Sequence, residues 1–234
     1  MYFLPSPEDI ALAYKNTTSL TFDKIVYELS ITFGVSRESV EMAYRRPTND
    51  LDDVISQKLQ IKNPQLKSVA HFHHDLWKQQ LLPGDLYREL QQEFADLIET
   101  SLHLNRMTDQ YYVVTSHRNE GKTVSLMKWT QKVLVDASLR IFFGDKLLEL
   151  DPDLPRHFLD FDDDSWKLVY KWPNATKMHT AKAKMTNALV RYLALPREER
   201  KGAAYLVEMM EKTQRALGFS ETDIANVFCI VLWT

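Results

Sequence analysis

The sequence has a single cysteine, Cys229, in 234 residues, so no disulfide can form within the chain. One thiol is typical of a protein from a reducing compartment, and it excludes a disulfide scaffold. Glycine is also scarce, because six glycines are about 3% of the chain, against about 7% in an average protein. Glycine serves tight turns and bulges, so its shortage favours helices over a strand-rich fold.

Long apolar runs and an excess of one charge are missing as well. No run reaches the roughly 18 apolar residues that a membrane-spanning helix needs, and Pro5 and Pro7 interrupt the apolar start, so we expect neither a membrane span nor a signal peptide. The net charge of −3 provides no general attraction for nucleic acid or anionic lipid. With 44% hydrophobic and 26% charged residues, the composition is that of a soluble globular protein.

Apolar residues recur at helical spacing through most of the chain. Ser6 with Asp9, and Ser220 with Asp223, form capping boxes that start helices. We expect a strand at 109–116, a strand end at 1–4 and, at 47–68, a surface loop with one helical turn. Helices are expected within 6–16, 20–34, 35–46, 71–82, 85–102, 126–144, 154–173, 174–195, 197–218 and 220–234. The sequence therefore predicts a mainly α fold with one or two short β elements.

The segment HFHHD contains three histidines and an aspartate within residues 71–75. His71, His73 and Asp75 resemble part of the HxHxDH pattern of di-metal hydrolases, but Leu76 replaces the last histidine, and a strand-to-loop junction would be needed to aim the ligands at one ion. The flanking sequence is helical. A polar helix face is therefore the default interpretation, and a basic face toward an anion is its main competitor.

Two further motifs have simple structural interpretations. EGKTVS, residues 120–125, contains Gly-Lys-Thr, but a phosphate-binding loop needs glycine where Ser116 stands, so we expect a turn before a helix. DFDDDS, residues 160–165, has no calcium-loop spacing, and we interpret its aspartates as a helix N-terminus.

The remaining reactive and charged groups also favour structural roles. Cys229 stands between Phe228 and Ile230, so we expect a small buried core residue and no catalytic thiol. Lys177, Lys182 and Lys184 lack interleaved aromatic residues and are interpreted as a solvated helix face, which predicts no nucleic-acid partner.

Several segments, in this order, resemble one enzyme family. They are LPSPEDIALAYKNTTSLTFD, LLPGDLYREL, VLVDASLRIFFGDKLLELDPDL, FLDFDDDSWKLVYKWP and YLALPREERKGAAYLVEMMEKTQRALGFSETDIA. Together they are similar to haem-thiolate monooxygenases of the cytochrome P-450 superfamily, and most similar to fungal members. The resemblance covers nearly the whole chain and depends on many ordinary segments, without one diagnostic motif.

The resemblance implies a large, mainly α fold that binds haem through a cysteine thiolate and oxidises a lipophilic small molecule. It also implies an NADPH-dependent reductase as partner and, for the family, the endoplasmic reticulum membrane as location. The family's ExxR pair and its glycine-rich cysteine loop do not occur here, and Cys229 is not that ligand. Residues 220–234 resemble the start of the family's long central helix. We therefore expect residues 1–234 to be a partial domain that lacks the membrane anchor and the haem-ligand half.

The family's WxxxR pair, which holds a haem propionate, corresponds to His74 and Lys78 in this sequence. Both types can donate to a carboxylate, but lysine lacks the planar fork of arginine. The resemblance also places residues that shape a substrate pocket within 20–44 and 158–172.

Three functions follow as expectations. The first is a truncated monooxygenase, inactive as this chain alone. The second is a non-catalytic helical binding or interaction protein that uses the residual apolar cleft. The third is a metal-dependent hydrolase built on His71, His73 and Asp75. Truncation would also leave an apolar patch exposed, formed by Val227, Phe228, Ile230, Val231, Leu232 and Trp233.

Overall fold

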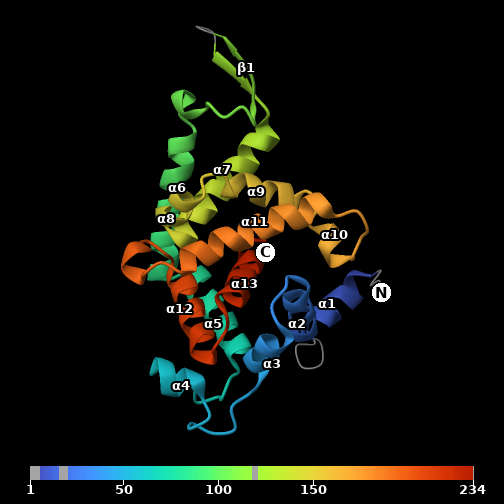
Figure 1. Cartoon of the computed structure of the whole chain (residues 1–234), viewed down its shortest axis with the longest axis vertical. Coiled ribbons are helices and arrows are strands. Elements are labelled where there is room, and N and C mark those ends of the chain that lie inside the picture. The colour runs from blue at the N-terminus through green and yellow to red at the C-terminus, as the bar shows by residue number, and fades with distance from the viewer. Residues whose placement is uncertain (1–5, 16–20, 118–120, 234) are drawn as a thin grey trace.

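The computed structural model describes residues 6–15, 21–117 and 121–233, so the strand end expected at 1–4 lies outside the described residues. The chain is mainly helical, as the sequence predicts (Figure 1). The helices are α1 (Pro7–Lys15), α2 (Asp23–Thr32), α3 (Arg37–Tyr44), α4 (Val54–Leu59), α5 (Val69–Leu81), α6 (Asp85–Ser101), α7 (Leu126–Phe143), α8 (Asp145–Leu150), α9 (Leu154–Asp162), α10 (Trp166–Val169), α11 (Thr176–Leu193), α12 (Tyr205–Leu217) and α13 (Glu221–Trp233), with short 3-10 turns at Leu104–Arg106 and Arg197–Glu199.

The sheet of the described residues is a single antiparallel hairpin of β1 (Val113–His117) and β2 (Gly121–Val124). Val113 pairs with Val124 and Ser116 pairs with Lys122. The hairpin projects from the helical body at the top of Figure 1. The strand expected at 109–116 is confirmed in its second half, whereas the turn expected at 120–125 is wrong, because Gly121–Val124 pairs with β1 as a strand.

Helix α11 runs across the middle of the molecule and packs on α9, α13 and α8 (Figure 1). Its buried face carries Met185, Leu189 and Tyr192, each with no exposed surface. The Tyr192 hydroxyl donates to the Phe143 carbonyl at 2.8 Å, so a polar group at the centre of this core is satisfied. This packing joins the second half of the chain into one hydrophobic core.

The expected exposed apolar patch on residues 227–233 is wrong. Phe228 is fully buried and Val231 is 9% exposed, while Val227, Ile230, Leu232 and Trp233 are half-buried and pack against the core. The ring of Trp233 lies 5.5 Å from that of Phe33, and its side chain forms a hydrogen bond with Asp162. The reason is that α11, α2 and the segment after α2 cover this helix.

The helix expected over 154–173 is interrupted. Helix α9 ends at Asp162, and α10 begins at Trp166. The interpretation of residues 160–165 as a helix N-terminus is therefore wrong for Asp160 and Asp162, which lie in the last turn of α9. Asp160 instead forms ion pairs with Arg156 and with Lys177, the latter at 3.0 Å on α11. Asp160 thus links α9 to α11.

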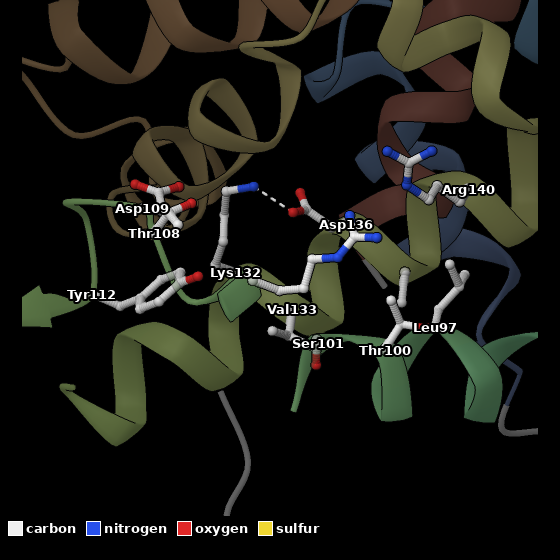
Figure 2. Close-up of a pocket in the computed structure, with 12 residues that line it drawn as sticks. Leu97, Thr100, Ser101, Thr108, Asp109, Tyr112, Lys132, Val133, Asp136 and Arg140 are labelled. Atoms are coloured by element: carbon white, nitrogen blue, oxygen red, sulfur yellow. Dashed lines mark hydrogen bonds and ion pairs between the residues drawn. The ribbon is translucent and has the colours of Figure 1, made fainter. Parts of the chain in front are cut away.

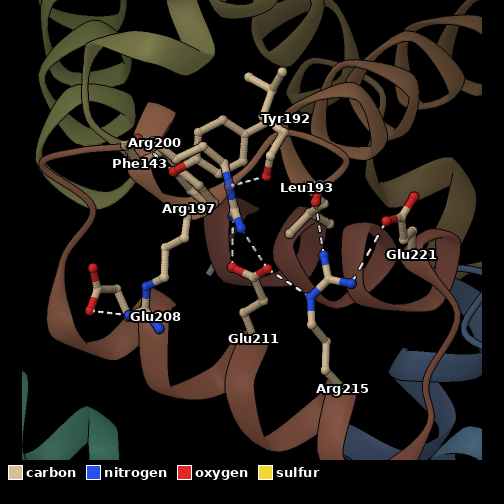
Figure 3. A network of polar contacts seen from close by, with 10 residues as sticks. Phe143, Tyr192, Leu193, Arg197, Arg200, Glu208, Glu211, Arg215 and Glu221 are labelled. Carbon is tan, nitrogen blue, oxygen red and sulfur yellow. Dashed lines mark hydrogen bonds and ion pairs between the residues drawn. The ribbon is translucent and has the colours of Figure 1, made fainter.

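A buried ion-pair network joins α12 to the segment before it (Figure 3). Arg200 donates to both carboxylate oxygens of Glu211, at 2.7 and 2.9 Å, and Arg215 donates to one of them at 2.8 Å. The Arg200 guanidinium also lies 5.0 Å from the centre of the Tyr192 ring. Because each buried charge has several partners, the network holds α12 in a fixed position on α11.

Candidate functional site

The principal candidate site is a cavity of about 450 Å³ at the junction of α2, α3, α5, α12 and α13. It is larger than three other pockets between described residues, which have volumes of about 190, 300 and 400 Å³. Small-molecule sites commonly have volumes of about 300–1,000 Å³ and apolar walls. The lining residues are Phe22, Asp23, Val26, Leu29, Ser30, Val35, Val40, Ala43, Tyr44, Ala70, His71, His73, His74, Trp77, Met210, Gln214, Phe219, Val227, Ile230 and Val231.

Most of the cavity wall is apolar. Val40 of α3 is buried and lines the cavity, and Val227 of α13 lines it as well. Phe22 and Val26 also line the cavity, and they are 74% and 44% exposed. A hydrophobic wall that continues onto the surface suits a lipophilic molecule that arrives from solvent.

One cluster of polar side chains at the cavity is centred on His71. Its Nδ1 lies 2.6 Å from the Ser68 hydroxyl, which is also the N-cap of α5, and its Nε2 lies 3.3 Å from Asp23. Tyr44 packs edge-on against the His71 ring. Burial, together with the negative charge of Asp23, raises the pKa of Tyr44 to about 12, so its phenol stays protonated at neutral pH.

His73 makes a separate contact, with α12. Its Nε2 lies 2.6 Å from the Thr213 hydroxyl, which donates its own proton to the Met210 carbonyl at 2.8 Å. With the Thr213 proton on this hydrogen bond, the hydroxyl accepts from His73 Nε2, and the lone pair of the ring is on Nδ1. Burial lowers the pKa of His73 to about 4, which keeps the ring neutral at physiological pH.

Gln214, the neighbour of Thr213 on α12, also lines the cavity. It is 1% exposed, and its Oε1 is buried without a hydrogen-bond partner among the described residues. Leaving a buried amide oxygen unpaired costs about 1–3 kcal/mol. Gln214 is therefore the polar group of this cavity whose hydrogen bonds the described protein does not provide.

The two predicted propionate ligands lie on the outer side of α5, and both are exposed. His74 borders the cavity, whereas Lys78, one turn further on, is not among its lining residues. The i,i+4 spacing leaves both able to approach one carboxylate. Their role as a pair that holds a haem propionate stays a prediction.

The described residues do not fit a haem iron that needs a thiolate. Cys229 has no exposed surface, and its sulfur lies 3.7 Å from the Thr186 hydroxyl of α11, on the side of α13 away from the cavity lining. Burial raises the pKa of this thiol, which disfavours the thiolate. The expectation of a buried core cysteine is confirmed.

The metal-site hypothesis finds no support in the geometry. His71 points to Ser68 and Asp23, His73 points to Thr213, and Asp75 forms an ion pair with Lys67 at 2.5 Å. Across the part of the chain that the structure describes, no three His, Cys, Asp or Glu side chains converge. Helix α5 spreads these side chains over different faces, whereas a strand would have aligned alternate ones.

A second pocket, of about 300 Å³, lies between α6 and α7 (Figure 2). Lys132 donates to one carboxylate oxygen of Asp136, while Oδ1 of Asp136 is buried without a partner among the described residues. Burial raises the pKa of Asp136, and the hydrogen bond from Lys132 opposes that shift. Arg140 pairs with Asp145 nearby. The mixture of paired charges indicates a polar surface groove and offers little to an apolar ligand.

Thr213 and Gln214 are site residues that the sequence did not predict. A signal was available, because Leu206, Met210 and Leu217 set out a helical stripe on which Gln214 also falls. A glutamine on an apolar stripe is either satisfied inside the core or placed next to a cavity. His73 was singled out, but as a metal ligand, and its partner on α12 could not be found from local spacing.

No protein-family model, curated protein or solved structure matches this chain. None of the helices that the structure describes has both the length and the apolar character needed to cross a bilayer.

Proposed function

We propose that this chain forms part of a cytochrome P-450-like fold and binds a lipophilic small molecule, without oxidising it as this chain alone. The observation that carries the proposal is the apolar cavity bounded by α2, α5 and α13. These segments resemble the parts of the family that shape the substrate pocket, support the haem propionates and begin the central helix.

The absence of oxidation follows from the surroundings of Cys229. The only thiol of the sequence is buried against α11 and does not face the cavity. A thiolate supplies the electron density that a haem monooxygenase needs for O–O cleavage, and no described residue supplies it here. An NADPH-dependent reductase is accordingly a partner of the family chemistry and is not required for binding.

The second candidate is a helical binding protein unrelated to haem enzymes. The same cavity favours it, because an apolar wall binds lipophiles whatever the ancestry of the fold. A pyridine haemochrome assay of the purified protein, with its visible spectrum, separates the two. Stoichiometric haem favours the P-450-like fold, and a carbon monoxide difference band typical of thiolate ligation would overturn the claim of inactivity.

Binding itself is tested with naphthalene as an apolar probe, followed by quenching of tryptophan fluorescence, because Trp77 lines the cavity. We expect saturable binding that Val227→Phe weakens at least about fivefold by filling the cavity. Val114→Phe is the matched control, since Val114 is 64% exposed on β1. Equal loss in both variants, or no saturation in the unmodified protein, would contradict the proposal.

A further inference from the structure

The cavity wall is mostly apolar, and besides the cluster of His71 and Asp23 it has polar side chains where α5 meets α12. His73 offers its Nδ1, because its hydrogen bond to Thr213 uses Nε2. Gln214 offers an amide with a buried, unpaired Oε1. Thr213 accompanies Gln214 on α12 and its hydroxyl lies 2.6 Å from His73 Nε2, so His73 and Gln214 line the cavity from two helices that pack on each other.

The positions of the Thr213 and His73 protons decide which ring nitrogen of His73 can accept a hydrogen bond. When the Thr213 hydroxyl gives its proton to the Met210 carbonyl, His73 donates from Nε2, and Nδ1 is then an acceptor. The terminal torsion of a glutamine is broad and roughly two-fold, so Gln214 can turn either its oxygen or its nitrogen toward the cavity. An apolar ligand would leave both groups unpaired, and that is unfavourable in a site with little water.

We infer that the ligand is an amphipathic molecule whose apolar body fills the cavity and whose hydroxyl group hydrogen-bonds to Gln214 and His73. A hydroxyl both donates and accepts, so it satisfies the amide in either orientation. A charged ligand end is disfavoured, because Asp23 is the one Asp, Glu, Lys or Arg among the lining residues and it already contacts His71 at 3.3 Å. This inference rests on the proposed function and adds the chemical class of the ligand.

The test compares 1-naphthol with 1-methoxynaphthalene, which have the same ring system but differ in the hydroxyl donor. Dissociation constants are measured by calorimetry at neutral pH. We expect 1-naphthol to bind about three- to tenfold more tightly, as one net hydrogen bond provides. In Gln214→Leu the ratio of the two constants should fall toward one, while 1-methoxynaphthalene binds within about twofold of its original affinity.

The matched control is Gln92→Leu, the same substitution on the exposed face of α6, where the ratio should not change. Thermal melting of each variant shows whether it is folded, and Gln214→Met replaces Gln214→Leu if the latter is not. Equal affinities of the two compounds for the unmodified protein, or an unchanged ratio in the Gln214 variant, would overturn the inference alone. Binding of neither compound would overturn the proposed function and the inference together.

Discussion

The most demanding structural prediction concerns Glu211, which accepts hydrogen bonds from Arg200 and Arg215 inside the protein (Figure 3). The Arg200 and Glu211 side chains are only 7% and 10% exposed. Glu211→Gln removes the negative charge and leaves Arg200 buried without a counter-ion. Breaking a buried pair in this way costs about 3–5 kcal/mol. Arg200 keeps its contact with the Leu195 carbonyl at 3.1 Å, so we expect the lower end, about 3 kcal/mol.

The assay is urea unfolding followed by circular dichroism, with Glu208→Gln as the matched control. Glu208 lies on the same helix and pairs with Arg197, but those side chains are 38% and 52% exposed. An exposed pair contributes about 0–1 kcal/mol, so the control should lose little. A loss in Glu211→Gln no larger than that in Glu208→Gln would refute the reasoning.

The same variant gives a pH dependence. Burial raises the pKa of Glu211, but the hydrogen bonds and positive charges of Arg200 and Arg215 lower it by more. The folded-state pKa of Glu211 therefore lies below the ordinary value. The unfolded state then binds the proton first as the pH falls. The stabilisation is complete above the unfolded pKa and is lost as the pH drops through the folded pKa. The difference between the unmodified protein and Glu211→Gln should shrink over that acidic range, and a difference that grows there would contradict this assignment.

Two further predictions use other parts of the chain. Gly144→Ala should destabilise the protein by about 2–4 kcal/mol in unfolding experiments, because the residue has a φ of +71° and a Cβ there would lie 2.3 Å from the Lys201 carbonyl oxygen. Gly218→Ala should cost less, because Gly218 has a φ of +85° but open space around it. The reverse order would count against the described packing. His73 should titrate near pH 4 in an NMR experiment, because burial lowers its pKa. The folded protein should therefore lose stability as the pH falls below the ordinary histidine pKa of about 6.5. Replacement of Thr213 by valine should change the His73 resonance, and an ordinary pKa would show that the ring is not held as described.

The helices were largely predictable, because capping side chains next to each helix in the sequence determine where it starts. Ser6 and Ser220 accept hydrogen bonds from the backbone of Asp9 and Asp223, as the capping boxes predict. Gly218 ends α12 in a left-handed conformation, as its position after the apolar stripe predicts.

The failures arise where distant segments decide the local structure. Gly121–Val124 became a strand because β1 provides a partner, and pairing of that kind leaves no trace in the local periodicity. Residues 227–233 are expected to be exposed because the resemblance implies that a missing half of the fold covers them. The structure covers them with groups from far earlier in the chain, such as Phe33 against Trp233. Asp223 shows the same limit, since its carboxylate accepts from the backbone and hydroxyl of Ser36 besides starting α13.

The site was predictable only as a region. The resemblance places substrate-shaping residues within 20–44 and 158–172. Residues of α2 and α3 from the first range line the cavity, whereas no residue of the second range is among its lining residues. The individual polar groups could not be found, because the hydrogen bond of His73 to Thr213 joins helices that are distant in the sequence. Without that contact, His73 resembled a metal ligand and Gln214 resembled an ordinary helix residue.

The most direct measurement for the central claim is an NMR experiment that detects contacts between naphthalene and assigned methyl groups of the protein. Binding in the cavity predicts cross-peaks from the naphthalene protons to the methyl groups of Val40 and Val227, which line it from α3 and α13. Cross-peaks confined to exposed methyl groups such as those of Val114, or none at saturating naphthalene, would contradict the account.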